Sequence, residues 1–267
     1  MVRARRQVAR GALVAAVLLS AQVAQATYSP PLTRVRIDRD QRSHTPSLVY
    51  ALEGKSTAAT DLTLKAYGAQ YLGQFEFDFG FGLQVGAALG YADVDGTVGQ
   101  LALGGLAVNT GGIWVGGQLR AYQMLWKSEV DEAVARPSAL TVFVNLRTLF
   151  YDTAGGSEPD RADLRFFTVT GGVGAMAELS VSDYVSICPY AWLTPGVTTQ
   201  LDYRVRGLDF EANGGPSLRN PFLVGLDVWI YPFPPNWDDH ISLSVLASLV
   251  DTEGSDRSFA GVIGYTF

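Results

Sequence analysis

Two residues near the carboxy-terminal end have the types and spacing that nucleophilic catalysis requires. His240 and Ser242 are separated by one residue, and Glu253 follows eleven positions after Ser242. A histidine that accepts the serine proton, held in place by a carboxylate, would make the hydroxyl a nucleophile. However, a strand of about ten residues between His240 and the loop that carries Glu253 would separate the two by roughly 33 Å. We therefore expect His240 to be a polar residue beside a turn rather than part of a triad.

A pair of acids and an Asp-His pair form a second candidate site. Asp93 and Asp95 lie in a turn-like stretch, and Asp238 and His240 lie far along the chain. Carboxylates and a histidine that converge on one rim can activate a water molecule. Because only two strands are expected after His240, the strand order predicts that it lies at the rim opposite to Asp93. No group of residues has the spacing of a zinc site, and we expect neither a metal ion nor a cofactor.

Charged residues that alternate with apolar ones form the third and largest set. On the non-lipid face of a membrane strand, such side chains either line a water path or pair with one another to fill the interior. The arginines would attract an anionic solute in the first case and form Arg–carboxylate pairs in the second. The sequence leaves both interpretations open. The predicted lumen-lining and selectivity residues are Arg120, Arg147, Arg204, Arg206, Glu76, Asp78, Asp202 and Asp227, joined on that face by Lys65, Asn145, Glu178, Tyr122, Tyr190, Trp192 and Trp229.

Alternation of apolar and polar residues is what places these side chains. Between residues 112 and 126, Ile113 and Val115 share one face, while Gln118 and Arg120 share the other. This pattern is typical of strands that have lipid on one side and a lumen on the other.

The stretch from Leu62 to residue 92 predicts a hairpin. Its apolar residues have even numbers as far as Leu72 and odd numbers from Phe75 onward. A two-residue turn at Gly73-Gln74 would produce this change of parity. The glycine-rich face of the second strand would be a poor protein core, and we interpret it as a wet lumen.

The number of strands follows from the alternating runs. Single-chain bacterial barrels have an even number of strands. A turn at Thr194-Pro195-Gly196 would divide one long run and give twelve strands, which we favour; one tall strand there, with the weak run 47–53 left out, would give ten. The eleven runs are 47–53, 62–72, 75–92, 98–108, 112–126, 138–150, 164–179, 184–206, 219–231, 240–250 and 258–267.

The first 26 residues have the pattern of a cleaved secretory signal. Four arginines precede an apolar run from Gly11 to Leu19, and Ala24-Gln25-Ala26 is a small-x-small cleavage site. Residues 27–46 are rich in proline and charge, which is typical of a mobile periplasmic leader. Without the signal the chain has 16 basic and 26 acidic side chains, a formal charge of −10, which argues against nucleic acid as a partner. Cys188 is the single cysteine, so an intramolecular disulfide is excluded.

The last ten residues resemble the closing strand of bacterial outer-membrane β-barrels. Phe259, Gly261, Ile263, Tyr265 and Phe267 form one face of this stretch, and the chain ends on the aromatic Phe267. The resemblance implies that Tyr265 and Phe267 are an assembly signal for the barrel-assembly machinery and that Phe267 lies at the periplasmic side. It also implies a place in the outer membrane of a Gram-negative bacterium, in contact with lipid and lipopolysaccharide.

Two enzyme families share parts of these patterns. His240-Ile241-Ser242 with Glu253 looks like the arrangement of outer-membrane lipid A deacylases. Asp93, Asp95 and Asp238-x-His240 are similar to the acids and Asp-His of the omptin proteases. The expected positions on opposite rims argue against both, so we expect no enzymatic activity.

The sequence as a whole predicts an all-β protein, a transmembrane antiparallel β-barrel. We expect a signal peptide at 1–26, a periplasmic leader at 27–46 and the barrel at 47–267. The leading hypothesis is a narrow porin-like channel for a small solute. The alternatives are a closed structural or surface-display barrel without transport and, last, an outer-membrane hydrolase.

Overall fold

The computed structural model describes a chain built from antiparallel strands. Its described residues are 42–57, 60–77, 80–98, 106–129, 137–156, 162–205, 208–214, 222–233, 239–248 and 257–267. Among them, no helix has the length and apolar composition that crossing a membrane requires. The strands are β1 (Arg42–Thr57), β2 (Thr60–Glu76), β3 (Phe81–Val98), β4 (Leu106–Lys127), β5 (Ala139–Gly155), β6 (Ala162–Ser182), β7 (Val185–Val205), β8 (Leu208–Gly214), β9 (Phe222–Ile230), β10 (His240–Ser248) and β11 (Arg257–Thr266).

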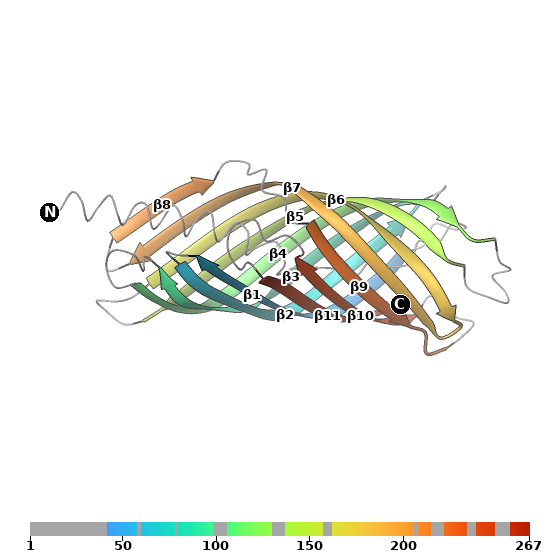
Figure 1. Ribbon diagram of the computed structural model, residues 1–267, viewed down its shortest axis with the longest axis horizontal. Coiled ribbons are helices and arrows are strands. Elements are labelled where there is room, and N and C mark those ends of the chain that lie inside the picture. Colours follow the sequence, from blue (N-terminus) through green and yellow to red (C-terminus); the bar gives the residue numbers. More distant parts are fainter. Residues whose placement is uncertain are drawn as a thin grey trace.

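Ten of these strands close into a barrel (Figure 1). Strands β1 to β7 pair in sequence order, β7 pairs with β9, and the ring closes through β10 and β11 onto β1. In the described part of the chain, β8 pairs with β7 alone, over Thr199–Val205, whereas β9 pairs with β7 over Val185–Leu193. Strands β8 and β9 therefore lie on the same side of β7, and β8 extends the wall at the end opposite to the C-terminus without adding to the ring.

The prediction of twelve strands is wrong for two reasons. The run 184–206 is one strand, β7, which continues through Thr194-Pro195-Gly196. The two ends of the run 98–108 belong to different strands, because β3 ends at Val98 and β4 begins at Leu106. The run 47–53, which the ten-strand alternative left out, belongs to β1. Strand β1 begins at Arg42, ahead of the boundary expected at residue 47, while the predicted signal peptide and residues 27–41 lie outside the described residues.

The predicted hairpin at Gly73-Gln74 is also wrong. Strand β2 runs through both residues to Glu76, and β3 begins at Phe81. Within β2 the even residues Leu64 and Leu72 are buried in the interior, and Lys65 is exposed on the outside. The parity expected for 62–72, which placed Lys65 in the lumen, is therefore reversed. Both faces of this strand carry apolar groups, so alternation of hydrophobicity alone did not distinguish them.

An extra residue in β7 reverses its two faces. Gly171 of β6 lies opposite Gly196 of β7, and Val173 of β6 lies opposite Leu193 of β7. The two residues 194 and 195 of β7 therefore oppose the single residue Gly172 of β6. Such a bulge shifts the side-chain alternation by one position. Beyond it, the register places positions 202 and 204 opposite Arg165 and Asp163 of β6.

The outside of the barrel has an apolar band between two sets of aromatic residues. Tyr67 marks one edge on the outer surface, and Phe77 marks the other, next to the end of the barrel that holds Phe267. The ten residue steps between them span roughly 33 Å along a strand, or about 25 Å across a membrane when strands tilt by about 40°. Exposed apolar side chains in and around the band include Leu48, Tyr50, Phe75, Phe81, Val85, Leu89, Tyr91, Val115, Leu119, Val144, Leu146, Val173, Leu243, Val245, Ile263, Tyr265 and Phe267.

Candidate functional site

The interior of the barrel is the place where charged and aromatic side chains gather. We call the half of the interior that lies nearest Phe267 the proximal half and the other the distal half. The alternation places Arg120, Arg147, Glu76 and Asp227 on this face, as the sequence predicts, and each is at most 5% exposed. Their role in selectivity stays a prediction.

Aromatic rings occupy the glycine positions of the interior wall. A side chain at Gly82 would collide with the ring of Tyr122, and one at Gly225 would collide with Tyr190. Trp114 lies against Gly90, where an added Cβ would be 2.6 Å from its Nε1. The glycine-rich face, which the sequence suggested to be a wet lumen, is therefore covered by aromatic rings from neighbouring strands. The sequence shows the glycines and the aromatics, but not that they meet, because the contacts join different strands.

The proximal half holds a hydrogen-bonded polar network. Gln84 accepts hydrogen bonds at Oε1 from Gln118 Nε2 (3.1 Å) and from Arg120 Nη1 (3.1 Å). Near the proximal end, Gln74 Nε2 donates to Glu76 Oε1 (2.8 Å), and the Tyr122 hydroxyl approaches the same oxygen at 3.5 Å. Alternation placed Gln118 on the same face as Arg120, but the predicted site residues did not include the glutamines.

Two interior arginines are covered by aromatic rings. The guanidinium carbon of Arg120 lies 4.7 Å from the ring centroid of Phe143, and that of Arg147 lies 5.1 Å from the ring centroid of Trp192. Trp192 in turn stacks on Tyr190, with 5.7 Å between centroids. Cations in this position are attracted by the electron-rich ring face, and here the rings also exclude water from the charge.

The distal half of the interior is apolar on the strands around the β1–β11 seam. Along β1 the interior residues change from Thr45 and Ser47 to Val49 and Ala51, all of them buried. Strands β2, β3, β10 and β11 change in the same direction away from Phe267. The interior residues run from Ser242 and Ser244 to Leu246 on β10, from Thr266 to Val262 and Ala260 on β11, from Gln74, Leu72 and Gln70 to Ala66 and Leu64 on β2, and from Gln84 to Ala88, Ala92 and Val94 on β3.

Several predicted site residues are not brought into the interior or lie outside the description. In the β6–β7 ladder, Asp202 lies opposite Arg165, whose side chain is 65% exposed, and Arg204 lies opposite Asp163. This register places positions 202 and 204 on the outward face rather than in the lumen, because opposite residues share a face. Asp78 and Arg206 lie outside the described residues.

The described members of the two hydrolase-like sets lie in different parts of the barrel. His240 is buried at the proximal end, with its ring 5.1 Å from that of Trp229 and 5.3 Å from that of Tyr231. Asp93 lies on β3 opposite Lys65, in the distal half and on the outward face. Glu253 and Asp238 lie outside the described residues. No group of three His, Cys, Asp or Glu side chains within the described residues has the arrangement of a metal site.

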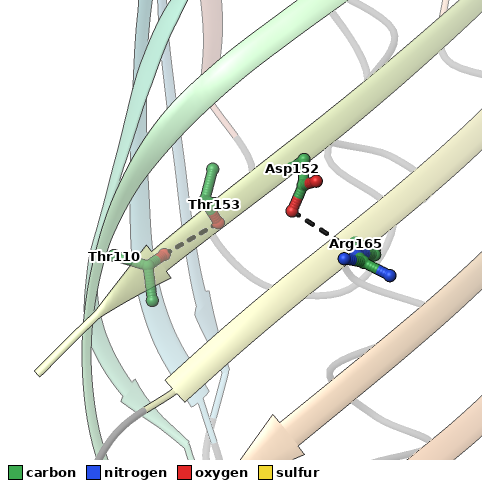
Figure 2. A network of polar contacts seen from close by, with 4 residues as sticks. All are labelled: Thr110, Asp152, Thr153 and Arg165. Atoms are coloured by element: carbon green, nitrogen blue, oxygen red, sulfur yellow. Dashed lines mark hydrogen bonds and ion pairs between the residues drawn. The ribbon is translucent and has the colours of Figure 1, made fainter.

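The outer and inner faces of the distal wall differ in their polar contacts (Figure 2). On the inside, the hydroxyls of Thr110 on β4 and Thr153 on β5 are 3.0 Å apart. On the outside, Arg165 Nε on β6 lies 3.5 Å from Asp152 Oδ1 on β5. Both partners of the outer pair are substantially exposed, so the pair is a feature of the barrel surface.

Comparison with known proteins identifies the fold. No family model matches the chain, and no curated protein matches it. Among solved structures, the outer membrane protease OmpT of Escherichia coli is similar, with a TM-score of 0.53, 10% identity, and coverage of 84% of this chain and 94% of that one. OprG of Pseudomonas aeruginosa has a TM-score of 0.42 at 10% identity and covers 88% and 99% of the two chains. Ail of Yersinia pestis has a TM-score of 0.35 at 11% identity, with 86% and 100% covered.

The fold and the apolar outer band define the class of protein. The chain is an antiparallel β-barrel of the bacterial outer-membrane class. Its location is the outer membrane. At 10% identity, the similarity to OmpT extends to the fold and not to activity.

Proposed function

We propose that this protein is a closed outer-membrane barrel that conducts no solute and acts through the part of its wall beyond the membrane. We favour the closed barrel over the porin-like channel, which was the leading hypothesis from the sequence. It rests on how the interior is filled.

The burial of the largest interior side chains is the observation that carries the proposal. Trp114, Trp192, Trp229 and Arg120 come from β4, β7 and β9, and each is less than 2% exposed. Side chains that line a water-filled pore are in contact with the water in it. Complete burial of three indoles and a guanidinium, spread along the barrel, instead supports an interior packed like a protein core.

The apolar part of the distal half, on the strands around the β1–β11 seam, supports the same conclusion. A hydrophobic constriction stops ions because water leaves it. Any ion that passed the polar proximal half would next meet the wall that includes Ala51, Ala66 and Ala92. The strands β3 to β7 continue beyond the outer aromatic residue Tyr91, as far as Val98 on β3, and carry the surface that we propose to be functional.

One observation favours the porin-like channel as second candidate. Glu76, Glu178, Arg120, Arg147 and Asp227 are ionisable residues in the interior at the level of the membrane. Such residues are costly to bury and often mark ion pathways. If the channel opens, these charges would set its selectivity.

Single-channel recording in planar bilayers separates the two candidates. We expect wild-type protein to give no steady current, because the interior is filled. A Trp114→Ala variant would remove one of the buried rings, and we expect it to raise leakage; Trp126→Ala on the outer surface is the matched control. Steady wild-type conductance would contradict the closed barrel and support the channel.

A hydrolase stays the least favoured proposal. His240 and Ser242 are buried in the proximal half, away from the outward-facing Asp93. We expect no lipid or peptide hydrolysis by the purified protein. Activity that His240→Ala abolishes would contradict this expectation.

A further inference from the structure

The seam between β1 and β11 extends to the last residue of the chain. The ladder pairs Gly54 with Arg257 at one end and Ser47 with Gly264 at the other. Beyond it, His44 N donates to Phe267 O (2.9 Å), and Phe267 N donates to His44 O (3.1 Å). This reciprocal exchange is that of a hydrogen-bonded antiparallel pair. The seam that closes the barrel thus ends on a rung made by His44, which the sequence analysis assigned to the leader.

The outward side of this rung is a cluster of three aromatic rings from three strands. A hydrogen bond of 2.6 Å joins the Tyr71 hydroxyl on β2 to His44 Nδ1 on β1. The His44 ring lies 5.7 Å from that of Tyr71 and 5.8 Å from that of Phe267, with interplanar angles of 29° and 38°. The imidazole therefore stands between the second strand and the end of the chain, and its hydrogen bond to Tyr71 fixes its orientation.

The inward side of the seam is closed next to this rung. The hydroxyls of Thr45 and Thr266 are 2.9 Å apart, and both residues are buried. Residues at the end of a strand fray unless something holds them. Here the rung, the ring cluster and the threonine pair hold Thr266 and Phe267 in place.

We propose that His44 is the positioning residue that locks the carboxy-terminal end of β11 into the barrel seam. Its backbone forms the last pair of hydrogen bonds in the seam. Its ring, which is held by Tyr71, packs against Phe267 and keeps that residue in place. Loss of the imidazole leaves the backbone rung without its outward support, so the seam opens locally from this end while the other strand pairs stay closed. This role is independent of whether the barrel conducts.

Hydrogen–deuterium exchange of the full-length protein in lipid vesicles tests the proposal. In His44→Ala, we expect exchange at the Phe267 and His44 amides to rise by about tenfold, the factor that corresponds to losing one hydrogen bond together with one aromatic contact. Exchange in β4, β5 and β6 is expected to stay unchanged. Tyr71→Phe keeps the ring and removes only the hydroxyl, and is expected to give a smaller increase at the same amides.

Tyr67→Ala is the matched control. Tyr67 lies on β2 like Tyr71, faces outward, is 48% exposed compared with 50%, and contacts Tyr91 at 5.7 Å. Its loss removes an equivalent aromatic contact away from the Phe267 end of the seam. Exchange at Phe267 is expected to stay at the wild-type rate in this variant.

A disulfide engineered between β1 and β11 provides the decisive experiment. Thr45 and Thr266 are a directly opposed pair whose Cα separation of about 4.5 Å allows a disulfide. In a Cys188→Ser background, Thr45→Cys with Thr266→Cys is expected to return the His44→Ala exchange rate to wild-type values after oxidation. The same variant, oxidised, provides folded protein if His44→Ala alone fails to fold. Seam exchange unchanged by His44→Ala, or raised equally in every strand, would overturn the proposal.

Discussion

The proximal and distal halves of the interior have the same strands around them and, near the β1–β11 seam, opposite chemistry. In the proximal half, Arg120 donates a hydrogen bond to Gln84, and the ring of Phe143 covers its charge. In the distal half, the interior positions of the strands at the seam hold Ala51 and Ala92. The difference shows that the interior of one barrel can be filled in two ways, by hydrogen-bonded polar side chains and by apolar side chains alone.

Introducing a charge into each half of the interior should give the largest difference in the free energy of unfolding between the halves. Leu64 and Gln84 are both buried in the interior, at 5% and 1% exposure, and Gln84 accepts a hydrogen bond from Arg120. We expect Leu64→Glu to lower the free energy of unfolding by about 3 kcal/mol or more, because a buried charge without a partner is costly. We expect Gln84→Glu to lower it by about 1 kcal/mol, because Arg120 lies within hydrogen-bond distance of the new carboxylate. Urea unfolding in lipid vesicles measures both. Equal losses would show that the halves do not differ in polarity.

Adding a side chain at a glycine that contacts an aromatic ring should have the next largest effect on the free energy of unfolding. Gly82 is covered by the Tyr122 ring on the inside, whereas Gly171 on the outside has nothing within 4 Å of an added Cβ. Gly82→Ala is expected to cost about 1–3 kcal/mol through overpacking. Gly171→Ala should be neutral or slightly stabilising, because alanine loses less conformational entropy than glycine. The same unfolding assay applies, and a tolerated Gly82→Ala would contradict a packed proximal half.

The smallest effect is expected on the outer surface. Arg165 and Asp152 are 3.5 Å apart, with side chains 65% and 41% exposed. We expect Asp152→Asn to change the free energy of unfolding by less than about 0.5 kcal/mol, since water and salt screen exposed pairs. A loss above about 1 kcal/mol at 0.15 M salt would mean that this pair is shielded from solvent.

The sequence predicted the fold class and much of the interior, but not the features that depend on pairs of strands. Alternation placed Arg120, Arg147 and Asp227 correctly because period two is a local property of each strand. It failed for Lys65, where Leu and Tyr compete as the apolar face, and for Asp202, where a bulge opposite β6 shifts the alternation. Bulges depend on the register with a partner strand.

The candidate site shows the same limit. The glycine-rich face of β3 was predicted to line a water-filled lumen, because the rings that cover it belong to other strands, such as Tyr122 on β4. The change from Thr45 and Ser47 to Val49 and Ala51 was readable in the sequence of β1. It acquires its meaning only when the neighbouring strands show the same change at the same end of the barrel.

Thiol labelling at Ala92 tests most directly whether the distal interior is dry. Ala92 is fully buried on the interior face of β3, whereas Asn109 is exposed at the distal end of β4. In a Cys188→Ser background, a small water-soluble methanethiosulfonate reagent should modify Asn109→Cys and leave Ala92→Cys unmodified in folded protein. Modification of Ala92→Cys at a rate close to that of Asn109→Cys would contradict the closed barrel.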